Sequence, residues 1–221
     1  LGDVYKRQGI FSEMELLLTM TPLQEVKFAC LDTETTGLSP LAGGKICEIA
    51  VSLSQNGQKL EEFTTLLNPG IPMHPDVIAI HGITNEMVRN APTYAEVLPR
   101  LLALLDGCVL VAHNAEFDLG FLRAETENCG LRLPDYPVVD TLKLARKNGR
   151  FQRNNLGVIA TALGIDAGGA HRAMADVRMT EKVLYCFLHD FARCGVNCLE
   201  ELQKYQFKRH ETAVLGLTPL P

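Results

Sequence analysis

Three short motifs in this sequence combine carboxylates with residues that could help them act on a substrate. They read DTETTG, HNAEFD and HRAMAD, and they begin at positions 32, 113 and 171. Asp32 and Glu34 follow an apolar run, residues 26–31, that has the period-two pattern of a buried strand. Both side chains are then expected on one face, where two carboxylates repel each other unless they share a proton or hold a cation.

Two further carboxylates favour the cation. Asp118 lies in the first turn of a helix that we expect to begin at Ala115 with Asn114 as its cap, and Asp176 lies near the start of the last long helix. A site of four carboxylates would suit Mg²⁺ or Mn²⁺, because hard cations prefer oxygen ligands. Two such ions, about 3.5 to 4 Å apart, stabilise the attacking and leaving oxygens of a phosphoryl displacement. The sequence therefore predicts phosphodiester hydrolysis.

The histidine of the third motif is expected to lie outside the helix. Five residues on an α-helix correspond to about 140° of rotation, so His171 and Asp176 could not point the same way if both were helical. Gly168 and Gly169 would let the preceding loop move while Asp176 stays fixed. An imidazole with a pKa near 6.5 can accept a proton from water at neutral pH, so His171 is predicted to be the general base.

The three motifs, in this order, resemble those of the DEDDh family, the DnaQ-like 3′-to-5′ exonucleases on an RNase H-like fold. The resemblance covers roughly residues 26–191 and includes the segments HGIT at 81–84 and VDTL at 139–142. Within the family, DTETTG and HGIT look most like the proofreading (epsilon) subunit of bacterial DNA polymerase III and the exonuclease domain of PolC. They look less like oligoribonucleases, whose first motif is closer to DLEMTG. The histidine at position 171 resembles the His branch.

The resemblance implies an α/β fold with a mixed five-stranded sheet flanked by helices on both faces, and two divalent cations, Mg²⁺ or Mn²⁺. It also implies five catalytic residues: Asp32, Glu34, Asp118, His171 and Asp176. Asp32 would contact both ions. Glu34 and Asp176 would complete one ion, and Asp118 would act on the other, directly or through water.

A further set of residues is expected to contact the substrate by the same resemblance. The set receives the terminal 3′-hydroxyl or lines the nucleotide path, and its members are Thr35, Thr36, Gly37, His81, His113, Asn114 and Phe117. Two of these histidines also have structural interpretations. His81 could bond the backbone of its own loop, which we favour, and for His113 a structural role at a helix terminus and substrate contact are equally plausible. Asp140 is expected to cap a helix and not to bind a metal.

Basic residues are expected to form a solvated face, and they comprise Arg146, Lys147, Arg150, Arg153, Lys204, Lys208 and Arg209. As an alternative hypothesis, the first four contact substrate phosphates. The formal net charge of −5 argues against a protein that coats long nucleic acid, but not against one that grips a chain end through metals. His189, Cys194 and Cys198 could bind zinc in principle, but their spacing is not a standard one.

The length of 221 residues and the hydrophobic content of 47% are enough for one sizeable α/β core but too little for two ordinary domains. We expect an exonuclease domain at 21–205, an unstructured or non-native extension at 1–20 and a C-terminal tail at 206–221 that could be a linker or a docking peptide. The seven cysteines are odd in number and scattered, as in a reduced cytoplasmic protein. No apolar run approaches the roughly 20 residues of a membrane span.

Periodicity places strands at 26–33, 46–54, 58–67, 108–112 and 138–139. The Asn56-Gly57 dipeptide predicts a hairpin, and Thr93 with Glu96 predicts a capping box. Besides the helix opened by this capping box and the helix that begins at Ala115, we expect helices at about 141–147, 155–163 and 174–191. Three strands followed by helices that alternate with short strands imply a mixed sheet covered by helices.

Together with the acidic motifs, the resemblance to the DEDDh family implies a metal-dependent 3′-to-5′ exonuclease that releases nucleoside 5′-monophosphates from DNA 3′ ends in proofreading or repair. Its expected partners are nucleic acid 3′ ends, with single-stranded DNA favoured, and a DNA polymerase subunit. Two alternatives stay open. One is a 3′-to-5′ exoribonuclease of RNA turnover, which would treat the 2′-hydroxyl differently. The other is a non-catalytic, polymerase-associated nucleic-acid-binding module, which would be expected to have lost an acidic position.

Overall fold

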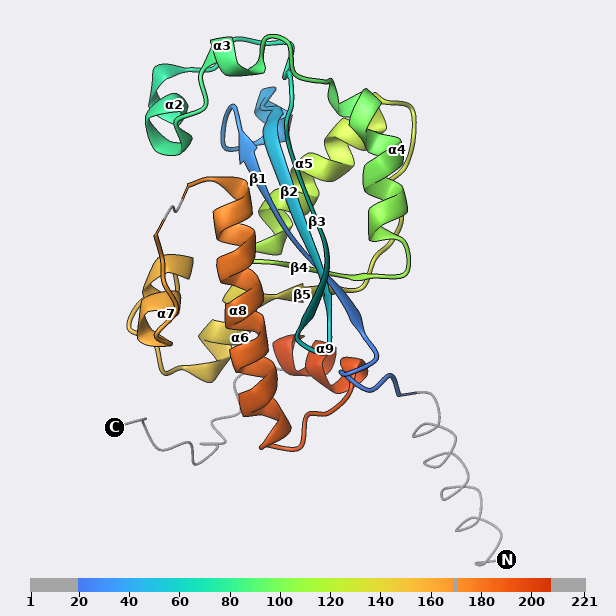
Figure 1. Cartoon of the computed structure of the whole chain (residues 1–221), viewed down its shortest axis with the longest axis vertical. Helices are drawn as coiled ribbons and strands as arrows, with labels where there is room; N and C mark the ends of the chain where they lie inside the picture. The colour runs from blue at the N-terminus through green and yellow to red at the C-terminus, as the bar shows by residue number, and fades with distance from the viewer. Residues whose placement is uncertain (1–19, 169–170, 208–221) are drawn as a thin grey trace, which may run out of the picture.

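A mixed five-stranded sheet forms the centre of the molecule (Figure 1). The computed structural model describes residues 20–168 and 171–207. The strand order is β3-β2-β1-β4-β5, in which β1 pairs antiparallel with β2, β2 antiparallel with β3, and β4 parallel with both β1 and β5. The strands are β1 (Lys27–Thr35), β2 (Ile46–Gln55), β3 (Gln58–Leu66), β4 (Val109–Ala112) and β5 (Val138–Asp140). The expected mixed sheet is thereby confirmed.

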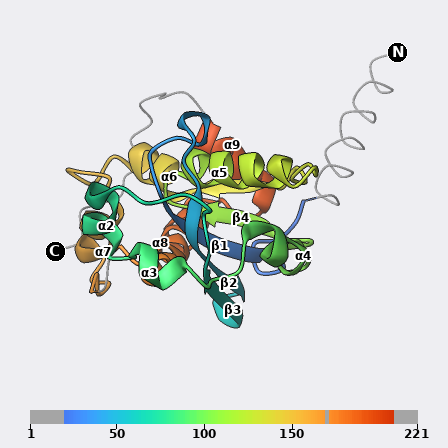
Figure 2. The same ribbon diagram turned by 90° about the horizontal axis from the view of Figure 1, so that it is seen from above.

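Helices cover both faces of this sheet. In sequence order they are α2 (Pro75–His81), α3 (Asn85–Val88), α4 (Tyr94–Leu105), α5 (Ala115–Asn128), α6 (Thr141–Asn148), α7 (Leu156–Ala162), α8 (Ala173–Ala192) and α9 (Leu199–Phe207), and a single 3₁₀ turn, η1 (Pro40–Ala42), follows β1. One apolar cluster joins the sheet to α6, α7, α8 and α9, and a second joins it to α4 and α5. In Figure 2, α8 lies to one side of β1 and β2 and α4 to the other.

Alternation along β1 decides which side chains face which layer. Phe28 and Cys30 belong to the cluster under α8, whereas Ala29 and Leu31 belong to the cluster under α4 and α5. Because side chains alternate with period two, the positions two and four residues beyond Cys30 continue on the α8 face. The acidic end of β1 therefore points toward the layer that contains α8.

Local sequence signals account for several connections. Asn56 and Gly57 both have positive φ, 50° and 73°, which two-residue hairpin turns require, so the predicted hairpin between β2 and β3 is confirmed. The capping box of Thr93 and Glu96 is confirmed at the start of α4. The side chain of Asp140 accepts hydrogen bonds from the first turn of α6, as its expected role as a cap requires.

Three local features differ from the sequence-based predictions. Asn114 precedes α5 with φ of 77°, and its side chain makes no capping hydrogen bond; its backbone N–H donates to Asp140 Oδ1 instead, at 3.1 Å. No helix was predicted over residues 75–81, but Pro75 occupies the first turn of α2, where its missing N–H is not needed. α9 was not predicted at all.

Most of the expected extension and tail lies outside the described residues, as do Gly169, Lys208 and Arg209. α9 nevertheless continues to Phe207, past the expected domain boundary at 205. No described helix combines the length and the apolar character that crossing a membrane requires.

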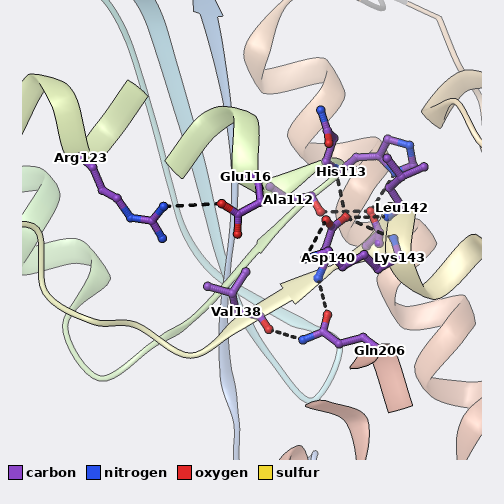
Figure 3. A network of polar contacts seen from close by, with 11 residues as sticks. Ala112, His113, Glu116, Arg123, Val138, Asp140, Leu142, Lys143 and Gln206 are labelled. Atoms are coloured by element: carbon purple, nitrogen blue, oxygen red, sulfur yellow. Dashed lines mark hydrogen bonds and ion pairs between the residues drawn. The ribbon is translucent and has the colours of Figure 1, made fainter. Parts of the chain in front are cut away.

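Gln206 ties α9 to the last strand. Its Oε1 accepts from the Asp140 backbone N–H at 3.0 Å, and its Nε2 donates to the Val138 carbonyl at 2.7 Å (Figure 3). The residue is 5% exposed. One side-chain amide near the end of the described chain thus satisfies these two backbone groups of β5.

Replacing this amide should destabilise the fold. Gln206→Leu keeps a similar volume but leaves buried backbone groups of β5 unpaired, so we expect the free energy of unfolding to fall by about 1 to 3 kcal/mol. Urea denaturation measures this loss. Lys204→Ala, at an exposed position of the same helix, should change stability by less than about 0.5 kcal/mol. Equal effects of the two substitutions would contradict the role given to Gln206.

Candidate active site

Three carboxylates from two distant segments meet at the end of β1. Asp32, Glu34 and Asp176 each offer an oxygen atom, and these atoms lie within 4.8 Å of one another. Among the residues that the structure describes, no other group of three or more His, Cys, Asp or Glu side chains has this geometry. His189, Cys194 and Cys198 do not form such a group.

The two elements bring these groups together in a simple way. Asp32 and Glu34 lie on the face of β1 that α8 covers, and Asp176 lies in the first turn of α8. The positive end of a helix dipole stabilises a carboxylate at that position. The Asp176 Oδ2 also accepts the His171 backbone N–H at 3.0 Å. The start of α8 is therefore the part of the helix that faces the acidic end of β1.

Asp118 lies beside this group and is held by the same strand. Its Oδ1 accepts from both the backbone N–H and the hydroxyl of Thr33, at 2.9 and 2.8 Å. Asp118 is 3% exposed, and burial raises its pKa to about 7. Its charge is also one of the causes that raise the pKa of Asp32. Thr33, between Asp32 and Glu34 in sequence, thus fixes the carboxylate of α5 next to the two carboxylates of β1.

The site is strongly acidic and only weakly compensated. Burial, followed by the charges of Asp118, Glu34 and Asp176, raises the pKa of Asp32 well above its usual range. Burial, with Asp176 and then Glu48, raises the pKa of Glu34 to about 7. In such a site protons or a cation must offset the repulsion. The ligand set, oxygen only, fits a hard divalent cation such as Mg²⁺ or Mn²⁺.

His171 lies before α8 in an exposed position, as the helix geometry predicted. Its φ of 68° is uncommon for a residue other than glycine. The hydrogen bond from its backbone to Asp176 holds it in this conformation. The backbone N–H of the proposed base, His171, is therefore hydrogen-bonded to Asp176, one of the clustered carboxylates.

The threonines after Glu34 are used within the loop that follows β1. Thr35 Oγ1 donates to the Gly37 carbonyl at 2.7 Å, and Thr36 Oγ1 accepts from the Lys45 backbone N–H at 2.9 Å. Thr36 also pairs its own N–H with the Lys45 carbonyl. These bonds shape the loop beside the acidic group, and they leave the substrate contacts of Thr35, Thr36 and Gly37 as predictions.

His81 is the buried last residue of α2, and its ring is bonded to the loop that follows this helix. Its Nδ1 accepts from the Ile83 backbone N–H at 3.0 Å, and its Nε2 lies 3.9 Å from the Cys47 sulfur. Burial lowers its pKa below the usual value. This environment favours the structural interpretation of His81.

His113 uses both ring nitrogens in contacts with the protein. Nε2 lies 2.8 Å from the Asn154 carbonyl, to which it can only donate, and Nδ1 lies 2.9 Å from Thr141 Oγ1. Burial lowers the pKa of His113. The next predicted contact, Asn114, adjoins it, and Phe117 packs its half-buried ring on Phe121 at 5.1 Å between centroids. For His113 these bonds favour the structural role.

One residue of the basic run, Arg150, is held by contacts within the protein. Arg150 Nη2 pairs with Asp190 at 2.6 Å, and its guanidinium lies over the ring of Phe151. Arg150 is therefore committed to α8, which argues against the alternative hypothesis that it contacts substrate phosphates. Arg146 and Arg153 are exposed.

Glu48 is the site residue that the motifs missed. It is 4% exposed on β2 and lies opposite Glu34 in the antiparallel register. A signal for it exists in the sequence: a glutamate inside the apolar run ICEIAVSL has to be buried with a partner. That partner could not be read from the sequence alone.

Glu34→Gln should stabilise the protein at pH 8 in the absence of divalent cations. The pKa of Glu34 is about 7 in the folded state against an ordinary 4.5, so the folded state retains a proton that the unfolded state releases. The stability that the protonated Glu34 gives to the folded state is fully present below the unfolded-state pKa, and it is lost as the pH rises through the folded-state pKa. The neutral amide of the variant does not ionise, so the variant avoids this loss. We expect a gain of about 1 to 2 kcal/mol, reduced from the full shift because the side chain is partly exposed.

Urea denaturation in EDTA at pH 8 measures this gain. Glu62→Gln is the matched control, because a hydrogen bond from Arg178 lowers the pKa of Glu62 and the amide should lose stability there. A loss of stability in both variants would contradict the electrostatic account of the site.

Comparison with known proteins gives relatives for most of this domain. The model of the Exonuclease family, RNase_T, matches residues 29–184. The DNA polymerase III subunit epsilon-like protein of Rhodobacter capsulatus is 42% identical over 171 residues, which cover 75% of this chain and 24% of that protein. The PolC-type DNA polymerase III of Streptococcus thermophilus is 35% identical over 182 residues, which cover 81% of this chain and 12% of that protein.

A solved structure, Exonuclease X in complex with 5′ overhanging duplex DNA, matches with a TM-score of 0.64 and 26% identity over 81% of this chain and 99% of that chain. The chain spans less than a third of the length of the curated relatives it matches. The matched range contains all three motifs. This chain therefore belongs to the exonuclease family, and its resemblance to the DEDDh (DnaQ-like) members with their RNase H-like fold is confirmed.

Proposed function

We propose that this protein is a 3′-to-5′ exonuclease that depends on two divalent cations, hydrolyses phosphodiester bonds at DNA 3′ ends and releases nucleoside 5′-monophosphates in proofreading or repair. One observation carries the proposal: the oxygens of Asp32, Glu34 and Asp176 converge within 4.8 Å, with Asp118 fixed beside them. A fold tolerates such crowding when a cation is available to offset it.

The four carboxylates would hold Mg²⁺ or Mn²⁺, with Asp32 central to the set. When bound, such ions polarise the scissile phosphate and stabilise the charge that develops during displacement. Thr33 keeps Asp118 directed to the site, and the backbone of His171 keeps Asp176 in place. The imidazole of His171, in its exposed loop, would take the proton of the attacking water.

DNA is the favoured substrate because of what the relatives are. Exonuclease X was solved with duplex DNA that carries a 5′ overhang, which leaves a recessed 3′ end. The epsilon-like and PolC-type relatives are polymerase proteins by name, and this supports a DNA polymerase subunit as partner. The presence of all four carboxylates and the histidine argues against a non-catalytic module.

Asp32→Asn should abolish most of the activity, because Asp32 is the carboxylate that would contact both cations. We expect the rate on single-stranded DNA to fall at least about a hundredfold. Oligonucleotides labelled at the 5′ end and incubated with Mg²⁺, Mn²⁺ or EDTA should give ladders that shorten from the 3′ end, only with metal and only with the unchanged protein. Full activity of Asp32→Asn in Mg²⁺ would remove the assignment.

A matched RNA oligonucleotide in the same assay tests the substrate class. We expect faster release of deoxynucleoside than of ribonucleoside 5′-monophosphates. The reverse order would replace the proposal by the exoribonuclease alternative, and the absence of any ladder would favour the binding module.

Salt dependence separates the basic residues. If Arg146 and Arg153 contact phosphates, neutralising each to Gln should reduce the slope of log K against log salt by about 0.7 for single-stranded DNA. Arg150→Gln is the control, since Arg150 is paired with Asp190, and it should leave the slope unchanged. Binding by fluorescence anisotropy gives the slopes. An unchanged slope in all three variants would place the basic run outside the substrate path.

A further inference from the structure

Glu48 makes three hydrogen bonds to the start of α8. Its Oε1 accepts from Arg172 Nη2 at 2.7 Å, and its Oε2 accepts from Arg172 Nε at 3.1 Å and from the Ala173 backbone N–H at 3.1 Å. Ala173 is the first residue of α8, whose N–H has no acceptor within the helix. A side chain of β2 thus serves as the cap that Arg172, at the N-cap position, does not itself provide.

The same glutamate stands beside the acidic group. Glu48 and Glu34 are directly opposed on neighbouring antiparallel strands, so their side chains share one face. Opposed like charges destabilise a strand pair. The bidentate contact with Arg172 offsets the charge of Glu48, whose side chain is 5% exposed. Arg172 also acts against the carboxylates that raise the pKa of Glu34.

Arg172 transmits this contact to the third motif. Its carbonyl accepts the backbone N–H groups of Ala175 and Asp176, at 2.8 and 3.2 Å. The preceding residue, His171, donates its N–H to the Asp176 carboxylate. The position of Asp176 relative to β1 therefore depends on where Arg172 is held, and Glu48 holds it.

We propose that Glu48 is a positioning residue that, through Arg172 and Ala173, sets the distance of Asp176 from Asp32 and Glu34 and thereby the affinity of the site for divalent cations. This inference rests on the proposed function of the carboxylates. We assign Glu48 a positioning role and not that of a ligand, because both of its oxygens accept hydrogen bonds from the start of α8 and it is absent from the group of converging carboxylates. Loss of comparable supporting contacts weakens metal binding by about 10- to 100-fold.

The chain offers a matched control on the same helix. Arg178 and Glu62 form a second bidentate ion pair between α8 and the sheet, with distances of 2.9 and 2.7 Å. That pair joins α8 to β3, and its members are absent from the acidic group. It reproduces the chemistry of the Glu48–Arg172 pair without the connection to Asp176.

Mn²⁺ binding to the full chain, measured by titration calorimetry without substrate, tests the proposal. The variants are Glu48→Gln, Arg172→Gln, their double mutant, Arg178→Gln and Glu62→Gln, each studied well below its own unfolding temperature. We expect the Kd for Mn²⁺ to rise at least about tenfold in Glu48→Gln and Arg172→Gln. The double mutant should be no weaker than the weaker single mutant, because both remove one connection. The two control variants should bind like the unchanged protein.

A second variant guards against loss of folding. Arg172→Lys keeps the charge but not the planar fork, so it should fold and show a smaller rise in Kd than Arg172→Gln. The exonuclease rate gives an additional readout: kcat should fall in Glu48→Gln while KM for the oligonucleotide changes less than twofold.

The other outcomes have distinct meanings. If the unchanged protein binds no Mn²⁺, the proposed function fails and this inference with it. If it binds and the Glu48 and Arg172 variants match the Arg178 and Glu62 controls, only this inference is overturned. If Glu48→Gln weakens binding while Arg172→Gln leaves it unchanged or tightens it, Glu48 acts as a ligand and the positioning role is overturned.

Discussion

Electrostatic repulsion among partly buried carboxylates is the constraint on which the rest of this structure depends. The acidic groups come from β1, α5 and α8, and the charges of Asp118 and Asp176 raise the pKa of both Asp32 and Glu34. Nothing in their own chemistry favours such proximity, so the surrounding fold has to impose it. The apolar clusters on both faces of the sheet provide that frame, because they fix α5 and α8 against opposite sides of the same strands.

Much of this frame follows from short-range patterns. The alternation in β1, the Asn56-Gly57 turn and the box of Thr93 and Glu96 depend on residues that are close in sequence, and these features were predicted correctly. The three motifs indicated which carboxylates would matter, and the structure brings Asp32, Glu34 and Asp176 together. In these regions local preference and tertiary packing agree, and this agreement is why the features could be predicted from the sequence.

The remaining features depend on pairings between distant segments. Glu48 meets Arg172 only because β2 lies beside β1 and α8 begins above both, and no local signal encodes that register. α9 matters because its Gln206 satisfies backbone groups of β5, a strand that lies far away in the sequence. Asn114 was predicted to be a cap because its residue type favours that role. In the structure its backbone N–H instead donates to the side chain of the nearby Asp140.

The two hydrogen bonds between Thr33 and Asp118 divide the site into two structural groups of residues. Asp32 and Glu34 belong to a single central strand, and Asp118 is hydrogen-bonded to the same strand at Thr33. Asp176 and His171 lie at the beginning of a separate helix. A sliding of α8 against the sheet would therefore displace Asp176 and His171 together, while the other three carboxylates keep their mutual spacing.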